Sequence, residues 1–256
     1  MFADLSPAAW VVGALVVFLT GLSKAGFAGA LGGVGVPLLA TTMPAAQAAA
    51  ILLPVLYAVD WTGMRLYWRS FSRQEMRRLL PGMVVGVLAG WFLFSWLKPE
   101  WMTLIVGLIA IGLAVVRLLP RLLQGGKRQP AGLISARCWS AVAGLSSTLA
   151  HAGGPPLFAY LGQRGLDKQT FIATASCFFF VMNLIKLLPY LSLGLVNWQE
   201  LGHSLLLMPF VPLGVFAGFW LQRRISQHAF DRSFTLILLA TGLYLSFSVA
   251  PLLLRR

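Results

Sequence analysis

The segment Gly21–Ala40, GLSKAGFAGALGGVGVPLLA, contains six glycines, a proline and Lys24, although it lies in a long apolar region. A glycine in a helix interior costs about 1 kcal/mol relative to alanine, and a charged residue at the centre of a membrane helix costs about 2.5–3.5 kcal/mol. Irregular backbone at membrane depth is tolerated only where protein or a water-filled cavity satisfies its polar groups. We therefore predict a broken helix here, next to a cavity.

The composition is that of an integral membrane protein. Of 256 residues, 58% are hydrophobic and 11% are charged, whereas soluble domains carry about 25% charged residues. Apolar runs long enough to span a bilayer recur along the chain, so the lipid bilayer is an expected partner. The net charge of +13 would suggest nucleic acid in a soluble protein, but most lysines and arginines lie in loops, as the positive-inside rule expects. We expect no nucleic-acid partner.

An all-α protein with about eight transmembrane helices fits the sequence, at about 20 residues for each span. The expected spans are 8–28, 44–64, 79–97, 101–119, 134–151, 169–190, 201–221 and 233–252. The segments 29–41 and 152–163 are apolar but too short and too rich in glycine and proline to be ordinary spans. We expect helix breaks near residues 25–36 and 151–156.

The two halves of the chain resemble each other. GVLAGWFL at Gly86–Leu93 matches GVFAGFWL at Gly214–Leu221, an offset of 128 residues, and GLSK at Gly21 matches GLSS at Gly144, an offset of 123. Each half also has a glycine pair followed by proline. The alternative is chance similarity between apolar segments. We predict two four-span repeats, 1–119 and 134–256, joined by the basic linker 120–133.

Internal duplication with broken helices is typical of secondary transporters. Their substrate sites lie near the bilayer midplane between repeats, where helix N-termini offer N–H groups to anions. For the GxxxG pairs Gly86–Gly90 and Gly214–Gly218 we favour close helix packing. The glycines expected at the backbone breaks are Gly32, Gly33, Gly153 and Gly154.

Two segments resemble the TauE/SafE sulfite exporter family: Gly21–Ala40 and AHAGGPPLFAYLGQRGLDKQTFIATASCFFFVMNLIKLLPYLSLGL at Ala150–Leu195. Together with the duplicated four-span pattern, the resemblance covers nearly the whole chain. It implies a multi-pass protein of the bacterial inner membrane that transports small sulfur-containing or organic anions, such as sulfite or sulfonates. The lysine at position 24, in the first glycine-rich motif, makes the chain similar to a subgroup of that family that has a lysine there.

Four ionisable residues are expected inside the membrane: Lys24, Asp60, His151 and Lys186. Such residues are costly in lipid and usually functional. The alternatives are that each lysine reaches to the membrane interface, that His151 is a structural histidine, and that Asp60 pairs with Arg65. Lys186 and Asn183, three residues apart, share a helix face.

A cationic, donor-rich site favours an anion with several oxygens. The candidate substrate-binding residues are Ser23, Lys24, Gly32, Gly33, Ser147, Thr148, His151, Gly153, Gly154, Thr174, Asn183 and Lys186. A histidine can gain a proton near neutral pH, so His151 is also the candidate for coupling proton movement to anion movement.

Motifs for metal binding, ATP hydrolysis and serine catalysis are absent from the sequence, so we expect no enzyme activity, no metal and no cofactor. A non-transporting membrane component, such as an assembly factor or a lipid-modifying enzyme, is the alternative, and a homodimer is left open. His203 and His228 are expected at the membrane interface. In an eight-span chain the basic loops share a side with both termini, so the positive-inside rule predicts cytoplasmic termini.

Overall fold

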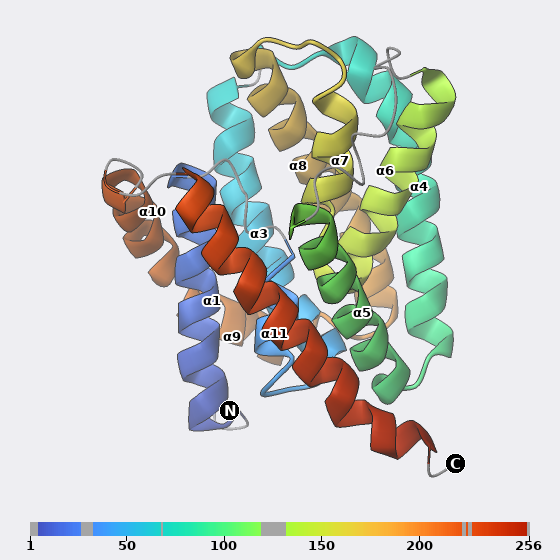
Figure 1. Ribbon diagram of the computed structural model, residues 1–256, viewed down its shortest axis with the longest axis vertical. Coiled ribbons are helices and arrows are strands. Elements are labelled where there is room, and N and C mark those ends of the chain that lie inside the picture. Colours follow the sequence, from blue (N-terminus) through green and yellow to red (C-terminus); the bar gives the residue numbers. More distant parts are fainter. Residues whose placement is uncertain are drawn as a thin grey trace.

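The fold is helical throughout the part of the chain that the computed structural model describes, which is residues 5–26, 33–67, 69–118, 132–221, 224 and 227–254 (Figure 1). The helices are α1 Pro7–Gly26, α2 Gly35–Leu39, α3 Ala45–Tyr67, α4 Arg73–Trp96, α5 Pro99–Leu118, α6 Leu133–Ala150, α7 Gly154–Leu161, α8 Lys168–Ser192, α9 Trp198–Leu207, α10 Phe210–Leu221 and α11 Gln227–Leu254. The predicted all-α class is confirmed.

Several helices are long and apolar enough to cross a membrane. Within the described residues these segments are Arg73–Trp96, Pro99–Val116, Gln169–Ser192 and Trp198–Gly218. Shorter apolar segments are Pro7–Ser23, Ala45–Trp61 and Leu238–Pro251. All of these segments overlap spans that the sequence predicts.

The helices α4, α8 and α9 each begin after a residue whose side chain caps the helix. Oxygens of Ser72, Asp167 and Asn197 accept hydrogen bonds from backbone N–H groups in the first turns of α4, α8 and α9. Such bonds satisfy donors that have no partner within the helix. At Asp167, hydrogen bonds from Thr170 lower the pKa of the carboxyl.

The bundle has two ends, which we name after these caps. At the Ser72 end, the loops before α4 and α8 meet, because Gln169 Nε2 donates to Ser70 Oγ at 3.0 Å. At the Asn197 end, a pocket lies between the start of α3 at Ala45, the end of α4 at Phe94 and the loop after α8 at Leu193. In Figure 1 the Ser72 end is at the top and the Asn197 end at the bottom.

In the helix pairs α1–α2 and α6–α7, the chain starts at one end of the bundle and returns to that same end. α1 starts at the Asn197 end, where Trp10 packs against His203 of α9, and α2 leads back to that end into α3. α6 starts at the Ser72 end, where Arg137 lies beside Gly82 of α4, and α7 leads back to that end. Neither pair therefore carries the chain from one end to the other.

This topology corrects the predicted location of the termini. α11 runs antiparallel to α5, with Leu245 near Val106 and Leu238 near Ala110, so it finishes at the Asn197 end. Both chain ends lie there in Figure 1, opposite the basic α3–α4 loop. The expectation that the basic loops share an end with both termini is therefore wrong, because it counted the chain through α1–α2 and through α6–α7 as crossings. The side of the membrane on which the termini lie stays a prediction.

Glycines bring α4 close to α6 and α1 close to α10. A Cβ on Gly86 would collide with the backbone of Ala141, and a Cβ on Gly214 would collide with the backbone of Phe18. Phe18 and Ala141 are 123 residues apart, and the two glycines are 128 apart, which are the offsets of the sequence matches. The prediction that these GxxxG pairs serve helix packing is confirmed.

The predicted span 201–221 is interrupted. α9 ends at Leu207 and α10 begins at Phe210, with a turn at Met208–Pro209. Proline has no N–H to donate and disfavours helical backbone in the residue before it. α9 is thus a separate ten-residue helix at the Asn197 end.

Candidate functional site

The second predicted break is confirmed. α6 ends at Ala150, and His151 adopts a left-handed conformation with φ 51° and ψ 30°. The N–H of His151 donates to Ser147 O, which is the bond of an αL capping motif, and the N–H of Ala152 donates to Ser146 O. α7 then begins at Gly154, so both Gly153 and Gly154 lie at the break, as predicted.

The first break lies between α1, which ends at Gly26, and α2, which begins at Gly35. Gly33 precedes α2 in a turn with φ 96°, a conformation that glycine adopts without strain. The backbone of Lys24 is in the last turns of α1. The side chain of Lys24 and all of Gly32 lie outside the described residues.

The two breaks meet in the middle of the bundle. A Cβ on Gly33 would lie only 2.8 Å from the Ala152 methyl group. Gly33 precedes α2, and Ala152 lies between α6 and α7, so segments about 120 residues apart are in contact. A side chain larger than hydrogen at position 33 would push the two breaks apart.

Lys186 is the most buried cationic centre beside these breaks. Its side chain is 0% exposed, and Nζ donates to Ser147 O at 3.2 Å, to Ser147 Oγ at 3.0 Å and to His151 Nδ1 at 2.8 Å. An ammonium group has three donors, so all three are used. The carbonyl at the end of α6 also offers the negative end of a helix dipole. The alternative that Lys186 reaches to the membrane interface is therefore wrong.

His151 is held at both ring nitrogens. Nδ1 contacts Lys186, and Nε2 lies 2.8 Å from Ala49 O of α3. Because a carbonyl can only accept, Nε2 carries the hydrogen, and Nδ1 accepts from the lysine. His151 is therefore neutral while Lys186 is charged, and a second proton on the ring requires Lys186 to move.

Tyr190 extends this centre and was missed from the sequence. Its hydroxyl donates to Thr148 O at 2.6 Å, and its ring stacks on His151 with centroids 6.4 Å apart. Phe94 packs edge-on against the Tyr190 ring, with centroids 5.7 Å apart, and also lines the pocket at the Asn197 end. The sequence signal that could have identified Tyr190 is its position, four residues after Lys186 on the same helix face.

A buried carboxylate lies one helix turn away. Asn183 Nδ2 donates to Asp60 Oδ2 at 2.7 Å, and both residues are 3% exposed. Asp60 also acts electrostatically on Lys186. The alternative partner, Arg65, instead lies over the ring of Trp61 at 5.5 Å. A buried acid, Asp60, therefore lies close to the buried Lys186.

Thr174, a predicted site residue, is not brought into these contacts. Thr174 accepts a hydrogen bond from the N–H of Ser72 at 3.0 Å, at the Ser72 end. It precedes Lys186 by twelve residues, which is about 18 Å along α8. Ser23 is buried in α1 at 2% exposure.

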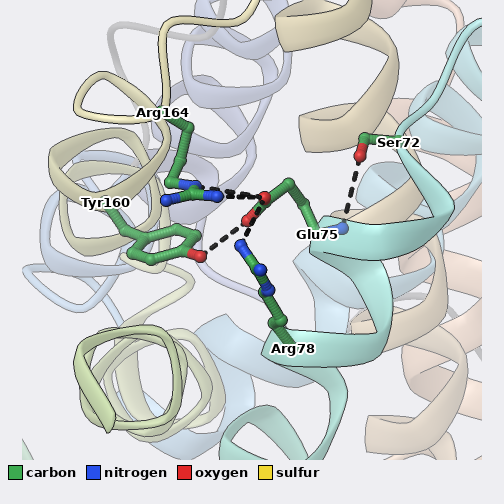
Figure 2. Close-up of polar contacts among 5 residues, drawn as sticks. All are labelled: Ser72, Glu75, Arg78, Tyr160 and Arg164. Carbon is green, nitrogen blue, oxygen red and sulfur yellow. Dashed lines mark hydrogen bonds and ion pairs between the residues drawn. The ribbon is translucent and has the colours of Figure 1, made fainter. Parts of the chain in front are cut away.

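A second buried acid, missed from the sequence, lies at the Ser72 end (Figure 2). Glu75 Oε2 accepts from the Tyr160 hydroxyl at 2.6 Å, and Oε1 accepts from Arg164 at 2.9 Å and from Arg78 at 3.1 Å. These bonds tie the end of α7 and the loop after it to the first turn of α4. Glu75 and Arg164 are 89 residues apart and belong to no common motif, so their contact could not be predicted from the sequence.

A third buried acid, Glu200, lies at the Asn197 end. Glu200 Oε2 is 3.3 Å from His203 Nδ1, and Oε1 accepts from Gln47 Nε2 at 3.0 Å. His203 is 0% exposed inside the bundle. The side chain of His203 therefore faces neither solvent nor lipid, and its expected depth at the membrane interface stays a prediction. His228 lies in a part of α11 whose side chains are outside the described residues.

A bundle of apolar helices with a buried cationic centre at two helix breaks is a multi-pass membrane protein built like a transporter. The sequence matches the family described as "Sulfite exporter TauE/SafE" over residues 13–245, and the chain belongs to that family. This confirms the resemblance inferred from the glycine-rich motifs. No curated protein and no solved structure matches the chain.

Proposed function

We propose that this chain is a secondary transporter of the bacterial inner membrane that moves small oxyanions, such as sulfite or sulfonates. The family supplies the transporter class. The observation that carries the proposal is the buried Lys186 ammonium beside the contact between the two helix breaks. A small anion that displaced His151 or Ser147 from Lys186 would receive charge-assisted hydrogen bonds in a region of low dielectric.

We propose further that two repeats, 1–119 and 134–256, move against each other around this centre, with 120–133 as the linker. The matched glycine contacts support this arrangement, since α4 packs on α6 as α10 packs on α1. The pair Asp60 and Asn183 supports it too, because these residues occupy matching positions in α3 and α8. Transporters of this type bind substrate between their repeats.

Charge balance favours movement of a proton with the anion. With Lys186 protonated and Asp60 ionised, the centre is neutral, so a monovalent anion would leave a net negative charge far from water. Protonation of His151 would restore neutrality, and its contact with Lys186 would be replaced by one with the anion. His151 is therefore our candidate for proton coupling.

The pocket at the Asn197 end is the proposed approach from that side. Its lining includes Phe94, Met102 and Leu195, and Phe94 packs on Tyr190, which packs on His151. We propose that this aromatic pair separates the pocket from the centre in the conformation seen here. Rotation of Phe94 or Tyr190 would then open the centre toward the Asn197 end.

The orientation proposed here follows from the charges at the two ends. Exposed arginines at the Ser72 end include Arg65, Arg69, Arg73, Arg77 and Arg137, whereas Lys98 is the basic residue of the α4–α5 turn at the other end. Cytoplasmic loops carry the excess of lysine and arginine. The Ser72 end is therefore assigned to the cytoplasm and both termini to the periplasm.

The test is anion flux in liposomes that contain the purified full-length protein. A panel of sulfite, sulfonates and carboxylates is offered with and without a pH gradient, and protein-free liposomes serve as the control. Saturable uptake of at least one oxyanion, faster when protons can enter with it, is expected. Absence of saturable flux for every compound, with folded protein, would contradict the proposal.

A further inference from the structure

The ring nitrogen Nε2 of His203 is buried in the bundle and has no hydrogen-bond partner among the described residues. A carboxylate can only accept a hydrogen bond, so Nδ1 of His203 carries the hydrogen that it shares with Glu200. Nε2 then has a lone pair, and within the described part of the chain it has no hydrogen-bond partner. The ring can therefore take up a second proton at this nitrogen.

The surroundings of the pair hold Glu200 firmly in place. Gln47 of α3 donates to one carboxylate oxygen, and the Trp10 ring of α1 meets the His203 ring edge-on at 5.5 Å. Ser204 Oγ donates to Ile51 O of α3 at 2.7 Å, which fixes α9 against that helix. The carboxylate is thus oriented toward the imidazole by bonds that do not involve a cation.

Other ionisable groups on the neighbouring helices are distant. α1 and α3 pack against α9. The ionisable residues of these two helices are Lys24, Tyr57, Asp60, Arg65 and Tyr67. Each follows Trp10 or Gln47 by ten residues or more, which is at least about 15 Å along its helix. Among the described residues of α1, α3 and α9, His203 is therefore the group whose protonation would balance the buried carboxylate of Glu200.

The start of α4, at the Ser72 end, has a cap, a buried acid and a cation at the same spacing as the start of α9. Ser72 caps α4, and Glu75 is buried three residues later beside Arg78. In α9 the same spacing gives Asn197, Glu200 and His203. The cation beside Glu75 is permanent, whereas the cation beside Glu200 exists only while the imidazole holds a second proton.

We propose that Glu200 and His203 form a proton-binding site at the Asn197 end, distinct from His151. A proton taken up at Nε2 of His203 converts a buried carboxylate and a neutral ring into a neutral ion pair, and no other bond is made or broken. That this proton accompanies the anion rests on the proposed function, whereas the binding of the proton does not.

Proton binding is tested by nitrogen-15 NMR of histidine-labelled full-length protein in lipid nanodiscs. His203→Gln identifies the His203 signal by its loss, and His151→Gln is the matched control. Spectra are recorded from about pH 8 to 5, and the His203 ring is expected to change from neutral to protonated within this series. Glu200→Gln removes the counter-charge, and the change should then require a more acidic solution or disappear. A His203 ring that stays neutral, or stays protonated, over the whole range would overturn the proposal.

The coupling is tested separately by flux. In His203→Gln liposomes, uptake driven by a pH gradient should fall at least about tenfold, while exchange of labelled for unlabelled anion at equal pH should persist. Retention of both modes, or loss of both by a folded protein, would overturn the coupling role. If the wild-type protein moves no anion at all, the proposed function fails, and the NMR titration still decides whether the proton site exists.

Discussion

The carboxylate of Asp60 accepts a 2.7 Å hydrogen bond from Asn183, the residue 123 positions later in the chain. The same offset separates the matching GLSK and GLSS motifs. The pair joins α3 to α8 close to Lys186, and Asp60 is the acid whose charge acts on that lysine. The charge of Asp60 should therefore oppose the binding of an anion at the centre.

Asp60→Asn should tighten anion binding. At an effective dielectric constant of 20, removal of a charge about 8 Å away changes an interaction by about 2 kcal/mol, so affinity should rise at least about tenfold. Net uptake should become slower, because release of the anion becomes harder. Binding is measured by titration of the purified protein with sulfite or a sulfonate. The exchanged variant Asp60→Asn/Asn183→Asp is the control, and it should restore affinity to within a few-fold. Weaker binding by the single variant would show that Asp60 contacts the substrate or supports the site's shape.

His151→Gln should remove most of the pH dependence of flux. Glutamine can still accept from Lys186 or donate to Ala49 O, but it cannot take up a proton. Binding should remain measurable, while the flux profile flattens between about pH 5.5 and 7.5, around the ordinary imidazole range. Initial rates in liposomes at a series of pH values supply the measurement. A profile that tracks the wild type would assign the coupling to another group, with His203 the next candidate.

Gly86→Ala should destabilise the protein, because the new methyl group meets the Ala141 backbone where α4 and α6 pack closely. Forcing extra atoms into a well-packed contact costs about 1–3 kcal/mol. Gly112→Ala in α5 is the matched control, since nothing lies within 4 Å of the added Cβ. It should be neutral or stabilising by up to about 1 kcal/mol. Thermal unfolding of both variants in the same detergent separates the effects, and equal midpoints would refute the packing role of Gly86.

A reporter fused after α11 should report a periplasmic location. Alkaline phosphatase at that position should be active, and green fluorescent protein should be dark, because the Asn197 end is assigned to the periplasm. Reporters inserted in the α3–α4 loop, near Arg69, should give the opposite pattern. A fluorescent fusion at the C-terminal end would reverse the orientation proposed here.

The helix positions and both breaks could be predicted from the sequence because their causes are local. Glycine and proline weaken a helix wherever they occur, and the turn at Gly33 and the left-handed helix end at His151 lie where these residues cluster. The location of the termini could not be predicted in this way. It depends on whether α2 and α7 turn back, which is decided by packing between distant segments.

The buried site around Lys186 could be predicted only in part, because its contacts join segments that are distant in the sequence. Lys186 and His151 were recognised as costly residues in an apolar region, but their mutual contact depends on how α8 meets α6. Glu75 and Glu200 were missed because each follows a helix cap and resembles a surface acid. Their burial comes from Tyr160 and Gln47, which belong to other helices.

The central claim is that the Lys186 ammonium binds the transported anion. Loss of a charged hydrogen-bonding partner costs about 1.5–3 kcal/mol, so Lys186→Ala should weaken binding at least about tenfold. Lys186→Arg should keep part of the affinity, because it restores the charge but not the shape. Lys98→Ala, in the α4–α5 turn, is the control and should bind as the wild type does.

The direct measurement is the affinity of these purified, folded variants for the oxyanion that the wild type transports fastest. The order expected is wild type equal to Lys98→Ala, then Lys186→Arg, then Lys186→Ala with little or no binding. Unchanged affinity in Lys186→Ala would contradict the account, and it would leave Lys186 as a structural link between α8 and the end of α6.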